Sequence, residues 1–423
     1  MRALIYGACG VALTMLAACS SSQEGDSTGV VDVIGAISSP TPLKVSDLGS
    51  KITYVPLETN DSSLVPRRWA LCPTDNRLLV VVYSPWGMGS QTCLSFDFDG
   101  KFLGTIGYTG EDPVAYSNPF PLVSSDGNKL YFLRWGANGA YEQVYSANGK
   151  YLGKVTPAIP PLGNPASSVL LDSMITSVSG RTIDGNLYFS VYTGGLNGGA
   201  DTVYQRPFEE QPTERKAYQQ SVSSEVHGVM LHSTALYEEI EELGGDRRHE
   251  YGGSRFNQTV WTSGNTVRYR YSLSDTIYSI SGNNVSCAYV FDCGENGLKL
   301  SQLSKELPAD VVLVSEAIET SSQIVFGASR GWMNVKGHEP FVGYFDKATG
   351  KTFAAPASEG FVDDLTGFMP FYPVMSNNRG DLFGILTMDD IAEWREAHPD
   401  AELPEAIRNL DDEANPIIVI VSQ

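Results

Sequence analysis

The sequence predicts an all-β fold, namely a six-bladed β-propeller of four-stranded antiparallel blades with one or two short helices near the C-terminus. Three observations predict it: a six-fold recurrence of turn and strand, a repeated hairpin sequence, and strand-like segments at both ends of the chain. Units of this kind cannot bury their apolar faces alone, and a closed ring of small sheets solves that problem. Residues 39–423 are expected to form this single domain.

The first observation is a polar turn followed at once by a short apolar strand. Asp126-Gly127 before Leu130-Tyr131-Phe132 is one example. The turns recur at intervals of roughly fifty to eighty residues, as repeat architectures require. Each of them marks one expected blade, and they lie near Asp75, Asp126, Asp184, Ser263, Thr320 and Gly380.

The second observation is a strand–turn–strand sequence that occurs three times. Residues 96–104 are repeated as residues 144–153 and, more loosely, as residues 344–353. Asp, Asn and Gly at the centre of each copy supply the positive φ angles that tight hairpins need. We expect these hairpins to join the third and outermost strands of three blades.

The third observation concerns the ends of the chain. Residues 52–55 and 417–421 are both strand-like. Because a propeller must close its ring to avoid exposed sheet edges, one terminal strand is expected to join the blade built by the other terminus. A short helix is expected at residues 389–397, where a capping box begins and a proline follows, and a second at residues 404–410.

The first residues of the chain are typical of an export signal. Residues 1–18 are expected to be a signal peptide, in which the charged start Met1-Arg2 precedes an apolar stretch, residues 3–18, that is too short to span a bilayer. Leu16-Ala17-Ala18-Cys19 resembles the bacterial lipobox, in which the cysteine sulfur receives diacylglycerol; the alternative is a chance cysteine after an ordinary signal. Residues 19–38 are expected to be a lipidated, flexible tether. Acylated Cys19 would hold the protein in the cell envelope, at the outer membrane, on its periplasmic face or at the cell surface.

The charge of the chain limits its partners. The formal net charge is −20, from 49 acidic and 29 basic residues. Phosphate binding requires a basic patch, so this composition argues against nucleic acid as a partner. Anionic lipid headgroups would also be repelled, which leaves the acyl chains as the contact with the lipid bilayer.

Neither a metal site nor a cofactor is expected. Asp97 and Asp99 resemble the start of a calcium loop, but Ile106 stands where an EF-hand requires glutamate. His227 and His232 are five positions apart, which places them on different faces of a helix and on opposite sides of a strand. The remaining cysteines of the mature chain are expected to be buried free thiols.

Four segments of the chain resemble a large family of six-bladed β-propeller lipoproteins of Bacteroidetes, a family of unknown function. The segments are residues 46–59, 275–280, 363–373 and 415–420. The resemblance covers roughly residues 36–422 and implies the same fold. The loop of residues 107–116 departs from the pattern, because Ala115 stands where relatives usually have glutamate and Asp112 where they have glycine.

The longest interval between repeats, about residues 205–258, is the first place to expect a ligand. Insertions in repeat proteins often map to the binding face. The alternative is a solvated insertion with ordinary surface histidines. The candidate ligand-binding residues of this insertion are His227, His232, Arg247, Arg248 and His249.

A second candidate set is expected where the inner-strand loops of a propeller converge over the central channel. Aromatic side chains at such a place can stack on sugars, although aromatic residues also fill the space between blades. The candidates are Trp69, Arg134, Trp135, Tyr192 and the segment 363–372, which begins with Asp363 and Asp364.

No catalytic residue is assigned. Residues 327–331 match the G-x-S-x-G pattern, but that pattern needs a sharp strand-to-helix turn and no helical periodicity follows. The leading hypothesis is a membrane-tethered, non-catalytic propeller that presents a binding surface for a glycan, peptide or protein partner. The alternative is a hydrolase or lyase that acts on a sugar or lactone in the central channel. An enzyme predicts several ionisable side chains converging at one channel mouth, whereas a binding protein predicts a shallow face with aromatic residues.

Overall fold

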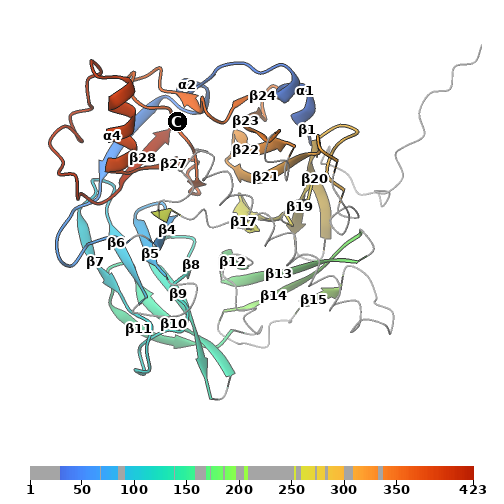
Figure 1. The fold of residues 1–423 in the computed structure, drawn as a ribbon. Coiled ribbons are helices and arrows are strands. Elements are labelled where there is room, and N and C mark those ends of the chain that lie inside the picture. Colours follow the sequence, from blue (N-terminus) through green and yellow to red (C-terminus); the bar gives the residue numbers. More distant parts are fainter. Residues whose placement is uncertain are drawn as a thin grey trace, which may run out of the picture.

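Six small antiparallel sheets surround a central axis in the computed structural model (Figure 1). This arrangement confirms the predicted six-bladed propeller. The structure describes residues 29–66, 68–83, 91–137, 139–157, 168–171, 173–183, 186–196, 204–207, 252–253, 259–271, 274–281, 284–299, 308–331 and 337–423.

The first five blades follow one another along the chain, each from its inner to its outer strand. The first contains β4 (Arg68–Pro73), β5 (Leu78–Val82), β6 (Thr92–Phe96) and β7 (Phe102–Ile106), and the second β8 (Pro121–Val123), β9 (Lys129–Gly136), β10 (Gly139–Ser146) and β11 (Tyr151–Val155). The third contains β12 (Ser168–Leu171), β13 (Met174–Ile183), β14 (Asn186–Gly195) and β15 (Tyr204–Pro207). The fourth contains β17 (Val260–Ser263), β18 (Thr266–Tyr269), β19 (Thr276–Ser281) and β20 (Asn284–Asp292), and the fifth β21 (Val312–Glu319), β22 (Gln323–Arg330), β23 (Glu339–Asp346) and β24 (Lys351–Pro356).

The sixth blade combines the last strand of the chain with a strand from its N-terminal part. Its strands are β26 (Met375–Ser376), β27 (Leu382–Leu386), β28 (Ile417–Ser422) and β3 (Lys51–Pro56). β28 pairs antiparallel with β3 along its whole length, with Val419 opposite Tyr54. The predicted closure of the ring by the terminal strands is therefore confirmed.

An N-terminal strap of residues 29–48 crosses the outside of three blades before β3 begins. β1 (Gly29–Asp32) adds in parallel to β20, α1 (Val33–Ser38) contacts β24, and β2 (Leu43–Lys44) pairs with β25 (Phe361–Val362). The strap ends in α2 (Val45–Leu48). Residues 29–38 are thus part of the fold and not of the expected flexible tether, because Val31, Val33 and Ile37 are buried against the fourth and fifth blades.

The repeated hairpins lie where the sequence predicts them. Gly100, Gly149 and Gly350 have φ angles of 83°, 80° and 68°, and each stands between the third and outermost strands of its blade. The turn near Asp184 occupies a different place in its blade from the other five turns of the repeat. The strands on either side of it, β13 and β14, are the second and third of their sheet, whereas the other turns follow the first strand. Asp184 itself lies outside the described residues.

Two further predictions concern helices and the serine motif. α4 (Met388–Ala397) begins at the predicted capping box of Thr387 and Asp390. Residues 404–410 form a turn and not a second helix. Ser329 of the G-x-S-x-G match lies inside β22, so no strand-to-helix turn presents it. Cys72, Cys93, Cys287 and Cys293 are free thiols, as predicted, but only Cys93 and Cys293 are buried, whereas Cys72 and Cys287 are half-buried.

The first blade gains a fifth strand. β16 (Gly252–Gly253) pairs in parallel with β4, on the side of β4 that faces away from β5. None of the helices within the described ranges is both long and apolar enough to cross a membrane.

One carboxylate is buried among apolar side chains between the second and third blades. Glu142 on β10 is 3% exposed, and the register places Leu133 of β9 and Val155 of β11 opposite it. Val144 follows on the same face of β10. In the described part of the chain no group donates a hydrogen bond to the Glu142 carboxylate. Burial raises the pKa of Glu142 to about 7.

We predict that Glu142→Gln flattens the pH dependence of stability. The folded state binds the Glu142 proton more tightly than the unfolded state, so stability falls as pH rises from 4.5, the ordinary pKa of glutamate, to about 7. The fall attributable to this group is about 3 kcal/mol. Urea unfolding at pH 5 and pH 8 should show the variant gaining stability relative to wild type at pH 8. If the free energy of unfolding changes by the same amount between pH 5 and pH 8 in the variant and in wild type, this account is wrong.

Candidate functional site

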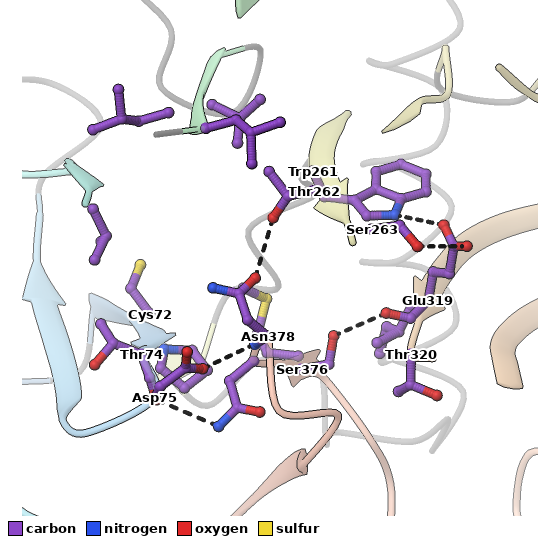
Figure 2. A pocket seen from close by; sticks show the side chains of 18 of the residues that line it. Cys72, Thr74, Asp75, Trp261, Thr262, Ser263, Glu319, Thr320, Ser376 and Asn378 are labelled. Atoms are coloured by element: carbon purple, nitrogen blue, oxygen red, sulfur yellow. Dashed lines mark hydrogen bonds between the residues drawn. The ribbon is translucent and has the colours of Figure 1, made fainter. Parts of the chain in front are cut away.

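A cavity of about 480 Å³ lies at the end of the central channel where the inner strands finish (Figure 2). All six blades contribute to its wall through the residues at or next to their inner strands. A hydroxyl side chain comes from each blade, and these are Thr74, Ser124, Ser168, Ser263, Thr320 and Ser376. The wall is therefore rich in groups that both donate and accept hydrogen bonds.

Hydrogen bonds between blades fix the rim of this cavity. The Asn378 backbone N–H donates to Asp75 Oδ1 at 3.1 Å, which joins the sixth blade to the first. Thr262 of the fourth blade donates to Asn378 Oδ1 at 3.1 Å (Figure 2). Ser376 Oγ donates to the Glu319 carbonyl at 3.3 Å, which joins the sixth blade to the fifth. The rim is thus a connected network and not a set of independent loops.

Glu319 is the centre of this network. Its side chain has no exposed surface, and its Oε1 accepts both from Ser263 Oγ at 3.1 Å and from Lys347 Nζ at 2.8 Å. Arg268 Nε also donates to it, at 3.3 Å. Two cations therefore face one buried carboxylate, which joins the fourth and fifth blades through charge-assisted hydrogen bonds.

The same carboxylate orients the one tryptophan of the cavity wall. Trp261 Nε1 donates to Glu319 Oε2 at 2.9 Å (Figure 2). Trp261 is half-buried, so part of the indole stays accessible from the cavity. Since its edge is held by Glu319, the ring is fixed in one orientation before any ligand arrives.

A buried guanidinium completes the wall. Arg270 is 6% exposed and donates from Nε to the Ser274 carbonyl at 2.9 Å and from Nη2 to the Val314 carbonyl. Its guanidinium also lies 5.4 Å from the centroid of the Phe291 ring. Burial lowers the pKa of Arg270 to about 10, so the group remains charged at neutral pH. Because backbone carbonyls occupy its donors, Arg270 mainly ties β21 to the fourth blade.

The cavity wall contains many hydroxyl, amide and indole groups but few groups that could transfer a proton. Among the residues that the structure describes, no three His, Cys, Asp or Glu side chains gather closely enough to bind a metal ion. The carboxylate of Glu319 is engaged by four donors. The other carboxylates of the cavity wall are Glu316 and Asp75, and a backbone N–H already donates to Asp75.

Several residues predicted as site candidates lie outside the described residues. These are Cys19, His227, His232, Arg247, Arg248 and His249. They remain predictions.

Arg134 and Trp135 lie at the other end of the second blade. β9 begins after the turn that borders the cavity and runs away from it, so Trp135 is roughly 20 Å from Lys129. Arg134 donates to the carbonyls of Gly110, Glu111 and Ala115, and thereby braces the loop of residues 107–116. Trp135 is 57% exposed.

Asp363 and Asp364 also lie away from the cavity, in the connection between β24 and β26. Asp363 is 2% exposed and accepts from Tyr54 Oη at 2.8 Å and from the Thr366 backbone N–H at 2.9 Å. Asp364 accepts from the Ser46 backbone N–H at 3.0 Å and from Ser46 Oγ at 2.7 Å. Both carboxylates therefore attach the connection to the N-terminal strap and to β3. Trp69, another candidate, is 2% exposed in a core cluster with Phe383.

Sequence reasoning did not identify Trp261 and Glu319. The turn residues Ser263 and Thr320 are part of the predicted repeat, and each functional side chain lies within two positions of one of them. A charged or aromatic residue next to a turn of the repeat was therefore the one feature of the sequence that could have indicated these side chains. Nothing in the sequence shows that these two turns meet.

Comparison with known proteins decides the family. A family model described as a domain of unknown function, DUF4934, matches residues 28–422. The chain belongs to the DUF4934 family. The resemblance seen in the sequence is thereby confirmed as membership of a propeller family of unknown function, whereas lipidation remains a prediction. No curated protein matches the chain.

Two of the solved structures similar to this DUF4934 protein come from Bacteroides. A Bacteroides fragilis protein assigned as exported has 14% sequence identity and a TM-score of 0.55, over 90% of this chain and 97% of that chain. A DUF4221 family member from Bacteroides vulgatus has 8% identity and a TM-score of 0.43, over 88% and 96% of the two chains. The first likeness shows a shared fold.

We predict that Glu319→Gln in this DUF4934 protein is strongly destabilising. The amide keeps an acceptor for Trp261 but leaves Arg268 and Lys347 without a counter-charge, at a cost of about 3–5 kcal/mol. The matched control is Glu339→Gln, because the Arg330–Glu339 pair at 3.0 Å is largely exposed and worth less than about 1 kcal/mol. Chemical denaturation of both variants measures the difference, and equal losses would show that Glu319 is not the centre of the network.

Proposed function

We propose that this protein is an exported, membrane-anchored propeller that binds a carbohydrate in the six-blade cavity. The observation that carries the proposal is the fixed indole of Trp261 within a wall of hydroxyl groups from every blade. Sugars present hydroxyl groups around an apolar ring face. Hydroxyl and amide groups of the cavity wall can form hydrogen bonds with the sugar hydroxyls, and an accessible aromatic ring can stack on the apolar face of the sugar.

The size and stiffness of the cavity support the same proposal. Its volume of about 480 Å³ is within the usual range for small-ligand sites, roughly 300–1,000 Å³. The hydrogen bonds from Asn378 to Asp75, from Thr262 to Asn378 and from Ser376 to Glu319 hold its rim in place without a ligand. A rigid site loses little conformational entropy on binding, which increases affinity.

Export and anchoring rest on separate observations. Leu16-Ala17-Ala18-Cys19 follows a signal-length apolar stretch. The structurally similar Bacteroides fragilis protein is assigned as exported. We place this protein in the cell envelope, attached to the outer membrane by acyl chains on Cys19.

A glycan screen with the mature domain tests the proposed ligand class. For an oligosaccharide that binds, Trp261→Ala should weaken binding by about thirty-fold, because truncating an interfacial tryptophan typically costs about 2 kcal/mol or more. Trp135→Ala, at the far end of the second blade, should leave that affinity unchanged and serves as the control. Binding that survives Trp261→Ala would place the ligand elsewhere.

The same screen separates binding from catalysis. Incubation with chromogenic glycosides and lactones should give no turnover above that of heat-denatured protein. Turnover that Asp75→Asn abolishes would instead favour the hydrolase or lyase alternative.

Anchoring is tested by replacing the acylated residue. In cells that express the full chain, Cys19→Ser should abolish incorporation of labelled palmitate and move the protein from the membrane fraction to the soluble fraction. Cys9→Ser is the matched control, because Cys9 lies within the signal and should be removed with it. If the Cys19→Ser variant carries no palmitate label but stays in the membrane fraction, another feature anchors the protein.

A further inference from the structure

Asp75 places a carboxylate in the wall of the six-blade cavity. It lies in the turn between β4 and β5, and its side chain is half-buried. Among the described residues, the one donor to this carboxylate is the Asn378 backbone N–H, 3.1 Å from Oδ1 (Figure 2). An ionised carboxylate can accept about four hydrogen bonds, so Asp75 keeps most of its accepting capacity for a ligand.

The basic side chains of the neighbouring turns do not neutralise this carboxylate. Arg77, two positions after Asp75, donates instead to Asn148 Oδ1 at 3.2 Å. Arg379, in the turn of the adjacent sixth blade, pairs with Asp381 at 3.1 Å. Within the described ranges, Asp75 therefore faces the cavity without an ion-pair partner.

The other cations at the cavity already bind protein acceptors. Arg270 is the cation among the described residues of the wall, and three backbone carbonyls accept from its guanidinium. Arg268 and Lys347 both donate to the buried carboxylate of Glu319. An anionic ligand group would therefore find no strong counter-charge among these three side chains.

Glu316 adds a second acidic side chain to the wall. The ladder between β21 and β22 has a register shift between Val314 and Glu316, and Gly327 is opposite Glu316. A Cβ atom at position 327 would lie 2.7 Å from Glu316 Oε1, so the glycine makes room for the carboxylate. Bulges of this kind often re-aim a side chain next to a functional site. The wall thus has acidic groups in both the first and the fifth blade.

Asp75 and Trp261 belong to one continuous stretch of the rim. Asn378 is hydrogen-bonded both to Asp75 and to Thr262, the residue that follows Trp261 (Figure 2). A cleft lined by one sign of charge raises the local concentration of ligands of the opposite sign. A ligand that stacks on an aromatic ring and also has a positive charge matches this rim.

We propose that the sugar bound in the six-blade cavity is an amino sugar, whose protonated amine pairs with the Asp75 carboxylate. This inference rests on the proposed function and adds the charge of the ligand to it. The ammonium group donates to Asp75 while the apolar face of the sugar stacks on Trp261. Charge-assisted hydrogen bonds are roughly twice as strong as neutral ones, so this pair determines which sugars are preferred.

Three sugars built on the same ring test the proposal. Glucosamine, glucose and glucuronic acid are titrated separately into the mature protein at pH 6 and followed by NMR. At this pH the first is a cation, the second is neutral and the third is an anion. Glucosamine should bind about ten-fold more tightly than glucose, and glucuronic acid more weakly than glucose. Added salt should reduce the advantage of glucosamine.

Two variants that each remove one negative charge separate a local contact from attraction to an acidic protein. Asp75→Asn should abolish the preference for glucosamine and leave the affinity for glucose within about two-fold, because the amide oxygen can still accept from Asn378. Glu339→Gln lies at the end of the fifth blade away from the cavity, on a largely exposed side chain, and should leave the preference unchanged.

The outcomes distinguish this inference from the carbohydrate proposal. If glucosamine does not bind, if it binds no better than glucose, or if Asp75→Asn keeps the preference, the inference is wrong. The carbohydrate proposal is decided separately, by the glycan screen and the effect of Trp261→Ala. Glucosamine binding that Asp75→Asn weakens but Trp261→Ala does not would support the ion pair and contradict stacking of the sugar.

Discussion

Main-chain pairing between β28 and β3 is the constraint on which the rest of the molecule depends. It places residues 51–56 and 417–422 in one sheet, so the sixth blade cannot form until the ring is complete. Once closed, the ring presents its inner turns around a single axis, and only then can one hydroxyl side chain from each blade face the same cavity. The site is therefore a property of closure and not of any single blade. Such non-local contacts have a high entropic cost during folding.

Polar contacts between blades then give this ring a defined inner rim. Glu319 connects Trp261, Ser263, Arg268 and Lys347, whereas Asn378 connects Asp75 and Thr262. The apolar clusters between blades bury most of the apolar surface, but apolar contacts are non-directional and do little to fix how the blades are oriented. Buried charges with several donors are sensitive to small displacements, so they select one arrangement of the fourth, fifth and sixth blades. The same contacts set the orientation of the Trp261 indole, which links stability of the ring to geometry of the cavity.

Much of the fold could be predicted because its signals are local. The Gly-Lys hairpins and the capping box of α4 depend on neighbouring residues, and each lies where the sequence indicates. The Asp184 turn differs in position from the other turns of the repeat, and the sequence does not reveal this because an Asp-Gly pair looks the same in the first or the second hairpin of a blade. The strap was missed because residues 29–38 are too short to show a periodicity, and only the fourth and fifth blades make their burial possible. The pairing of Trp261 with Glu319 joins residues 58 positions apart, so no spacing rule could predict it. Arg134 and Asp363 looked like binding residues, because the sequence gives no sign of the carbonyls and hydroxyls that they contact.

The parallel pairing of β1 with β20 determines how the fold would respond to tension. A pull on the residues before Gly29, directed back along β1, acts along the hydrogen-bonded ladder and loads all of its bonds together. Separation of the strands would then require shearing of the whole ladder, and the burial of Val31 and Val33 adds to the resistance. A tethered domain attached in this way withstands drag better than one whose first strand could be peeled off bond by bond.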